Sequence, residues 1–171
     1  MKDVSPEMYE DVLRFVFKWN RESGLQVKPT CAPQFMRLAK ELGVDASRWS
    51  RGCIAGISYC RIYPNGSVTP CPYLPIKVGN IRNNSFKEIW FGSEILNSLR
   101  DYEDNLQGRC GVCEYRTICG GCRARAFSLS ETDVNLYSKL QDPNTLSGNL
   151  FAEDPWCKYI PKTYAQGDMK I

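Results

Sequence analysis

The chain has 171 residues, of which 22 are Lys or Arg and 19 are Asp or Glu, so its net charge is only +3. That balance gives no strong field for nucleic acid or for an anionic membrane, and no apolar run reaches the roughly 18 residues of a membrane span. Histidine is absent, which removes the commonest general base and the commonest neutral metal ligand, whereas nine cysteines are present. We expect a soluble, cytoplasmic protein of one domain, or of a small domain with an appendage, that binds neither nucleic acid nor membrane.

The first thirty residues predict a helix followed by a strand. Ser5 and Pro6 form an N-cap and first-turn pair, and apolar residues recur at helical spacing before Gly24 ends the helix: Met8, Val12, Phe15, Val16 and Trp19. Residues 25–28 then alternate as a short strand that stops at Pro29. A helix followed by a strand is the repeating unit of an α/β sheet. The strand therefore requires a partner that is missing from this chain or supplied by another, or it pairs with a later hairpin.

Three more helices are predicted upstream of Cys110. Ala32 and Pro33 open one of them and Gly43 ends it. Its apolar face consists of Phe35, Leu38, Ala39 and Leu42. Residues 85–90 and 93–99 predict two short helices, whose apolar side chains are interpreted as core.

A hairpin is predicted between Cys60 and Cys71. The intervening ten residues predict two short strands joined at Asn65 and Gly66, and both of these residues tolerate a positive φ. Backbone pairing in the hairpin would bring the two cysteines together before any metal binds.

Eight of the nine cysteines form an ordered array, which is the main signal of function. The spacing is Cys53-x6-Cys60-x10-Cys71, then Cys110-x2-Cys113-x5-Cys119-x2-Cys122, and finally Cys157. Four thiolates complete the ligand shell of one iron–sulfur cluster, and such shells commonly combine a close-spaced run with one distant cysteine. The array therefore predicts cofactor binding.

Disulfides and zinc are the alternative uses of these thiols. Disulfides fit poorly, because the cysteine count is odd, the first twenty residues do not form a secretory signal, and the chain is long for a disulfide-stapled mini-domain. Two C-x2-C knuckles are what a zinc ribbon uses, but ribbons usually separate the knuckles by about 15 to 20 residues. Here only five residues intervene. The spacing favours iron–sulfur and leaves zinc open.

With these spacings, residues 52–161 resemble the SPASM domain, the C-terminal extension of many radical S-adenosylmethionine enzymes. The matching segments are Gly-Cys-Ile-Ala-Gly at 52–56, Pro-Cys-Pro-Tyr-Leu-Pro at 70–75, Gly-Asn at 79–80, Cys-Gly-Gly-Cys-Arg-Ala-Arg-Ala at 119–126 and Glu-Asp-Pro-Trp-Cys at 153–157. Upstream, Lys-Pro-Thr-Cys-Ala-Pro-Gln at 28–34 resembles the branch that decarboxylates or deacetylates modified tetrapyrroles on the way to heme. Related peptide-modifying maturases carry a similar second half.

The resemblance implies two 4Fe-4S clusters, although some relatives hold only one. The first cysteine set would be Cys53, Cys60, Cys71 and Cys122, and the second cysteine set would be Cys110, Cys113, Cys119 and Cys157. The chain departs from the family in spacing its last close pair by two residues, where three are frequent. It also has a longer polar stretch at about residues 129–146, which predicts a surface loop.

The motif C-x3-C-x2-C, which in radical enzymes binds the cluster that cleaves S-adenosylmethionine, is absent. We therefore expect the C-terminal part of a radical oxidoreductase or decarboxylase that is not competent alone. A radical core, upstream or on another chain, would bind S-adenosylmethionine, while the auxiliary clusters would relay an electron or help hold a tetrapyrrole or peptide. The alternatives are a free-standing electron-transfer module that docks a donor or acceptor such as ferredoxin, and a zinc-stabilised interaction domain.

Three residues are candidates for the substrate side: Cys31, Arg123 and Arg125. Cys31 lies on a turn that faces the barrel interior in the resembling enzymes, and its alternative role is that of a small buried apolar side chain. Four arginines lie near the thiols in the sequence, where positive charge raises a cluster potential and guides carboxylates: Arg109, Arg116, Arg123 and Arg125. Alternatively they are solvated, or pair with Glu114 and Asp101.

We therefore predict an α+β fold, in which a small SPASM domain is organised by clusters and contains a β-hairpin and short helices. Residues 1–48 would be a helix, strand and helix remnant of a partial (β/α) barrel, residues 49–161 the SPASM domain, and residues 162–171 a tail.

Overall fold

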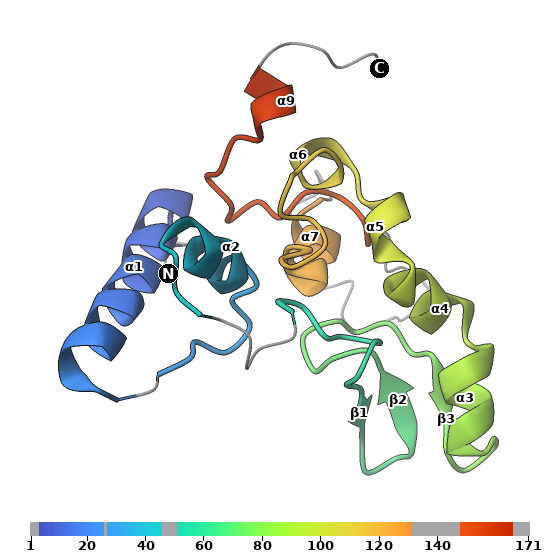
Figure 1. Ribbon diagram of the computed structural model, residues 1–171. Coiled ribbons are helices and arrows are strands. Elements are labelled where there is room, and N and C mark those ends of the chain that lie inside the picture. The colour runs from blue at the N-terminus through green and yellow to red at the C-terminus, as the bar shows by residue number, and fades with distance from the viewer. Residues whose placement is uncertain (1–3, 26, 46–50, 131–147, 166–171) are drawn as a thin grey trace. The chain divides into compact units, whose positions relative to one another are not determined.

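The computed structural model describes residues 4–25, 27–45, 51–130 and 148–165 (Figure 1). The chain divides into two compact units. Unit 1 combines residues 1–53, 107–122 and 153–171, and unit 2 combines residues 54–106 and 123–152. Each unit is thus assembled from stretches that are distant in sequence, and the domain boundaries at residues 48 and 161 stay a prediction.

The core of unit 1 lies between α1 (Pro6–Ser23) and α2 (Gln34–Glu41). The Ser5 hydroxyl accepts a hydrogen bond from the Met8 N–H at 3.2 Å, and Gly24 ends α1 with a φ of 69°. Phe17 and Phe35 stack with ring centroids 4.0 Å apart. The buried cluster consists of Leu13, Phe17, Ala32, Phe35, Leu38 and Ala39. Both predicted helices are confirmed.

A second apolar face of α1 points to solvent. The apolar residues that mark the helix in the sequence include Met8, Val12, Phe15 and Trp19, and they are 59%, 54%, 61% and 46% exposed. We call these four residues the α1 stripe. Because α2 covers the face that carries Leu13 and Phe17, the stripe is not the side that the helix buries. The helix is therefore apolar on two faces.

The strand predicted at residues 25–28 is wrong, because the described residues of this stretch form no strand. Val27 finds its hydrogen-bond partners elsewhere. Its N–H donates to Asn20 Oδ1 and its carbonyl accepts from Asn20 Nδ2, both at 2.7 Å. A side-chain amide thus supplies the donor and acceptor that a neighbouring strand would offer.

Unit 2 contains a three-stranded antiparallel sheet in the order β1 (Arg61–Ile62), β2 (Ser67–Thr69) and β3 (Gly79–Asn80). The predicted hairpin is confirmed, since Arg61 pairs with Thr69 across β1 and β2. Gly66 makes the turn with a φ of 83°. The strand β3 was not predicted, because two residues are too few to show a pattern of alternation.

Two helices of unit 2 begin at serine caps. Ser85 forms a capping box with Glu88 at the start of α3 (Phe86–Gly92), and Ser93 caps α4 (Glu94–Arg100). Both helices are confirmed. They are followed by α5 (Tyr102–Asn105) and α7 (Arg123–Leu129), while unit 1 also holds α6 (Gly108–Gly111) and α9 (Lys162–Ala165). The fold is α+β as predicted.

The polar loop at residues 129–146 lies almost entirely outside the described residues. None of the helices in the described ranges combines the length and the apolar character needed to cross a membrane.

Gly66→Ala should destabilise the hairpin. A Cβ at this position would lie 2.5 Å from Asn80 Oδ1, and the positive φ of 83° is itself unfavourable for a side chain. We expect the free energy of unfolding to fall by about 2 kcal/mol. The measurement is urea unfolding followed by circular dichroism. The control is Gly92→Ala in α3, where the added Cβ meets no atom within 4 Å. Equal unfolding midpoints for the two variants would contradict the role given to Gly66.

Candidate metal centre

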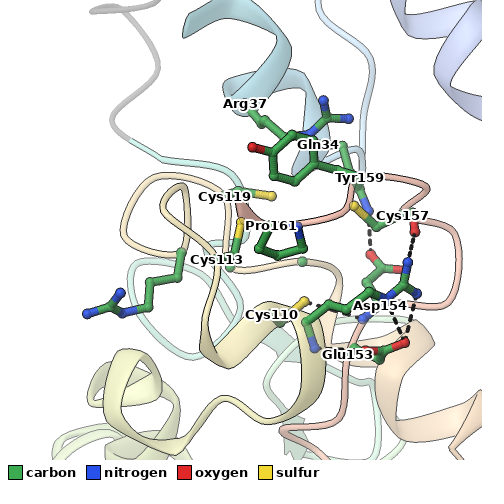
Figure 2. A pocket seen from close by; sticks show the side chains of 14 residues that line it. Gln34, Arg37, Cys110, Cys113, Cys119, Glu153, Asp154, Cys157, Tyr159 and Pro161 are labelled. Carbon is green, nitrogen blue, oxygen red and sulfur yellow. Dashed lines mark hydrogen bonds and ion pairs between the residues drawn. The ribbon is translucent and has the colours of Figure 1, made fainter. Parts of the chain in front are cut away.

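All four thiols of the second cysteine set line one pocket in unit 1. Cys110 lies in α6, Cys113 and Cys119 in the loop that follows it, and Cys157 in the C-terminal stretch (Figure 2). The complete lining is Gln34, Arg37, Arg109, Cys110, Cys113, Arg116, Cys119, Gly120, Gly121, Glu153, Asp154, Cys157, Tyr159 and Pro161. Three separate stretches of the chain therefore converge on this pocket.

Backbone N–H groups are directed at all four sulfur atoms of the second set. The Tyr115 N–H donates to Cys113 Sγ at 3.4 Å, and the Asp154 N–H donates to Cys110 Sγ at 3.5 Å. The N–H groups of Gly121 and Tyr159 act in the same way on Cys119 and Cys157, and they oppose the rise of these thiols' pKa. Hydrogen bonds of this kind stabilise anionic sulfur, which is the form that binds metal.

Paired glycines allow one of these contacts. Gly120 and Gly121 have φ values of 68° and 60°, in the left-handed region that other residues rarely adopt. The chain can therefore turn sharply after Cys119 and direct the Gly121 N–H back to its sulfur.

A buried carboxylate joins the cysteine-bearing stretches. Asp154 is fully buried, and its Oδ2 accepts hydrogen bonds at 2.7 Å from Gln34 Nε2 and from the Cys122 N–H. Its Oδ1 accepts from the Trp156 N–H at 3.1 Å, and its carbonyl accepts from the Cys157 N–H at 3.0 Å. Asp154 thus positions the backbone of cysteines from both sets.

The charged pair of Arg109 and Glu153 fixes the position of Cys157. The Arg109 N–H and Nε donate to the Glu153 carboxylate at 2.8 and 2.9 Å, and Arg109 Nη1 donates to the Cys157 carbonyl at 2.9 Å (Figure 2). Arg109 therefore pairs with Glu153 and not with Glu114 or Asp101. The Glu114 carboxylate instead accepts a hydrogen bond from the Tyr159 hydroxyl.

Burial favours the protonated form of three thiols of the pocket, Cys113, Cys119 and Cys157. It raises the pKa of the Cys157 thiol to about 11, and it also raises the pKa of Cys119 and of Cys113. A buried thiolate requires positive charge nearby, and bound metal supplies it when it displaces the thiol protons. The donor set therefore suits a thiolate-ligated cofactor.

The arrangement of the thiols also bears on which cofactor fits. A single zinc ion draws its ligands to about 2.3 Å, so four zinc-binding sulfurs converge on one point. Within the described part of the chain, no group of three or more Cys, Asp or Glu side chains meets that geometry. The thiols of the second set border the pocket, and metal analysis distinguishes zinc from an iron–sulfur cluster there.

Arg37 adds a cation that the sequence did not point to. Its guanidinium lies over the Tyr159 ring, 4.9 Å from the centroid (Figure 2). It pairs with Glu10 at 2.6 Å and with Glu41 at 2.8 Å. Its charge acts on Cys157 in the direction that lowers the pKa of that thiol.

The members of the first cysteine set lie in different units. Cys53 and Cys122 belong to unit 1, where the Cys53 N–H donates to the Cys119 carbonyl at 3.4 Å. Cys60 and Cys71 belong to unit 2 and lie at the open end of the hairpin, next to the Arg61 and Thr69 pair. The hairpin thus brings Cys60 and Cys71 to the same end, as predicted. The assignment of all four thiols to one cluster stays a prediction.

The candidates for the substrate side occupy unlike environments. Cys31 is exposed on its turn with a φ of 56°, so its interpretation as a buried apolar side chain is wrong. Arg123 is only 2% exposed, and its Nη1 donates to the carbonyls of Leu150 and Ala152 at 3.0 and 2.8 Å. Arg125 is half-buried in α7. Their roles toward a substrate stay predictions.

Comparison with known proteins agrees with the thiol array. Residues 53–123 match the SPASM family, which is described as an iron–sulfur cluster-binding domain. The chain is similar to the AdoMet-dependent heme synthase of Methanosarcina barkeri (strain Fusaro / DSM 804), with 37% identity over 93% of this chain and 44% of the relative. The AdoMet-dependent heme synthase of Oleidesulfovibrio alaskensis (strain ATCC BAA-1058 / DSM 17464 / G20) is 36% identical over 98% of this chain and 41% of the relative.

A peptide-modifying protein is also similar. The PqqA peptide cyclase of Rhizobium meliloti (strain 1021) is 34% identical over 58% of this chain and 30% of the relative. The chain thus spans less than half the length of each of these three relatives.

Asp154→Ala should weaken both the fold and cofactor retention. The change removes the acceptor of three hydrogen bonds, and leaving buried donors unpaired costs about 1–3 kcal/mol each. We expect the unfolding free energy to drop by about 3 kcal/mol and the iron bound per chain to decrease. Thermal unfolding and iron analysis measure the two effects. Asp154→Asn keeps the shape of the side chain and one oxygen, so it should lose less stability and less iron than Asp154→Ala. Asp11→Ala, on the exposed side of α1, should change neither the unfolding free energy nor the iron content. Normal iron content in Asp154→Ala would contradict its positioning role.

Proposed function

Because this chain carries a SPASM iron–sulfur cluster-binding domain at residues 53–123, we propose that it binds auxiliary 4Fe-4S clusters as part of a radical S-adenosylmethionine enzyme. The second cysteine set would hold one cluster, and the first cysteine set would hold another. The observation that carries the proposal is the pocket lined by Cys110, Cys113, Cys119 and Cys157, in which backbone N–H groups are directed at every sulfur.

The chain's own residues would hold and shield such a cofactor. Asp154 and Arg109 fix the backbone on either side of the pocket, and Cys119 is the thiol of the set that is shielded most from water, at 9% exposure. A 4Fe-4S cluster supplies one-electron chemistry when bound, so the domain would accept or deliver single electrons. Hydrogen bonds to sulfur and nearby cations would set the reduction potential at which the cluster exchanges electrons.

The class of enzyme follows from the relatives. Similarity to the AdoMet-dependent heme synthases extends over 93% and 98% of the chain, against 58% for the peptide cyclase. This supports a role in tetrapyrrole modification on the way to heme, in which the auxiliary clusters relay an electron or help position the substrate. A radical core that binds S-adenosylmethionine would be the catalytic partner.

The exposed α1 stripe supports the proposal that a radical core binds to this chain. Four large apolar side chains share one exposed face of α1, although the opposite face already packs on α2. Phe15 and Trp19 also stack on each other, with centroids 6.2 Å apart. More than half of the length of each heme synthase relative lies outside the matched segment. We propose that the radical core covers the stripe.

Metal analysis tests the cluster proposal. After anaerobic reconstitution we expect about eight irons and eight sulfides per chain, and the Mössbauer spectrum of 4Fe-4S clusters. Cys113→Ser and Cys157→Ser should each lower the iron content by about four, because each removes one ligand of the second cysteine set. Cys31→Ser is the matched control and should retain all the iron, since Cys31 is exposed outside the array. One or two zinc ions per chain without sulfide would overturn the proposal.

The core-docking proposal predicts that Phe15→Asp acts only when the core is present. In this chain alone Phe15 is 61% exposed, and a surface substitution should change the unfolding free energy by no more than about 0.5 kcal/mol. The second context is a chimera in which this chain replaces the matched segment of the Methanosarcina barkeri relative. In the chimera the aspartate would be buried, and we expect the unfolding free energy to fall by about 3 kcal/mol.

Thermal unfolding of both proteins measures the difference between the two contexts. Lys18→Asp introduces the same side chain at an exposed position of α1 outside the stripe, and it serves as the control. An equal effect of Phe15→Asp with and without the core would show that the stripe is not a docking face.

A further inference from the structure

Arg37 is a buried cation at the wall of the pocket that the second cysteine set lines. Its side chain is 2% exposed, and two carboxylates hold its terminal nitrogens, Glu10 at Nη2 and Glu41 at Nη1. Its Nε is also buried, and this N–H donates a hydrogen bond to no atom of the described residues. Buried donors without an acceptor are rare in proteins, so the orphaned Nε–H marks a place where an acceptor binds.

The surroundings limit what that acceptor can be. The Tyr159 ring covers the guanidinium, and the remaining neighbours on the pocket side include the thiol of Cys157. Sulfur atoms of a cluster and of its thiolates accept hydrogen bonds and carry negative charge. A buried arginine that keeps one donor available beside them matches both properties.

We propose that Arg37 sets the reduction potential of the cluster on the second cysteine set, through its charge and through an Nε–H donated to sulfur. This inference rests on the proposed function. Reduction adds a negative charge to a group that four thiolates already make anionic, and a nearby positive charge stabilises the reduced form. Arg37 lines the pocket whereas Glu10 and Glu41 do not, so Arg37 raises the potential, and the opposite charges of the two carboxylates behind it limit the rise.

Two substitutions should shift the potential in opposite directions. Arg37→Gln removes the cation and leaves its two carboxylates in place, so the equilibrium constant for one-electron reduction should fall at least about tenfold, which corresponds to about 59 mV. Glu10→Gln removes one neutralising carboxylate and should raise the potential. Arg37→Lys keeps the charge without the Nε–H, so its reduction potential should lie between those of the wild type and Arg37→Gln.

The measurement is a dithionite titration of the reconstituted chain followed by electron paramagnetic resonance, with the second-set signal assigned by its loss in Cys113→Ser. Arg14→Gln is the matched control. Arg14 also pairs with Glu10, at 2.8 Å, but its side chain is 44% exposed and does not line the pocket. Its removal should leave the potential unchanged.

The outcomes separate this inference from the proposed function. If the wild-type chain binds no cluster on the second cysteine set, the proposed function fails. If the cluster forms and Arg37→Gln titrates at the wild-type potential, or Glu10→Gln shifts it downward, the role of Arg37 alone is refuted. Should Arg37→Gln fail to fold, Arg37→Lys and Glu10→Gln still decide, because both retain a cation or a partner at the buried pair.

Discussion

The buried carboxylate of Asp154 holds together the stretches of chain from which the metal centre is built. An ionised group without solvent is costly unless donors surround it, and Asp154 meets donors from α2, from Cys122 and from Trp156. Its own backbone contributes in both directions, since its N–H reaches Cys110 Sγ and its carbonyl receives the Cys157 N–H. One residue thus couples the N-terminal helices to cysteines of both sets, and the pocket depends on this coupling.

Charged side chains of alternating sign lie behind the pocket. Arg37 faces the thiols, Glu10 and Glu41 lie against Arg37, and Arg14 contacts both carboxylates from the solvent side, at 2.8 and 3.6 Å. Burial raises the pKa of the Glu10 carboxyl, but hydrogen bonds and charge from Arg14 and Arg37 outweigh it and lower that pKa below its usual range. Glu10 therefore stays ionised at neutral pH. The cation that lines the pocket is in this way held in one place, and Arg14 offsets part of the negative charge of the two carboxylates behind it.

Much of this architecture could be predicted from local patterns. Serine caps, apolar spacing and the Asn65-Gly66 turn correctly gave α1, α2, α3, α4 and the hairpin, because these signals act within a few residues. The strand at residues 25–28 failed because its alternation says nothing about whether a partner exists, and Asn20 satisfies Val27 instead. The spacing likewise does not show which apolar face of α1 is buried, since only the position of α2 decides between the two faces.

For the same reason, the sequence predicted the cysteines of the site but not the polar residues around them. Cysteine spacing predicted a ligand set whose four members line one pocket, but no pattern assigned a role to Arg37 or Asp154, whose partners lie far away in the sequence. Gln34 and Asp154, for example, are 120 residues apart. Asp154 stands in the segment Glu-Asp-Pro-Trp-Cys that resembles the family, which was the available signal for it. Polar residues that act through tertiary contacts become visible only when the fold supplies those contacts.

Burial of the thiols links the assembly of the cofactor to the fold of unit 1. Cys119 is 9% exposed, and desolvation raises its pKa above the usual range of a thiol. Such a group gives up its proton when a cation replaces it, so metal binding in this pocket releases protons and stabilises the surrounding loops. The apolar core between α1 and α2 needs no metal, because Leu13, Phe17 and Phe35 pack there without contribution from the cysteines. The loops from residue 107 to 122 contribute no residue to this core, so thiolate ligation would add to the hydrogen bonds of Arg109 and Cys122 that hold them in place.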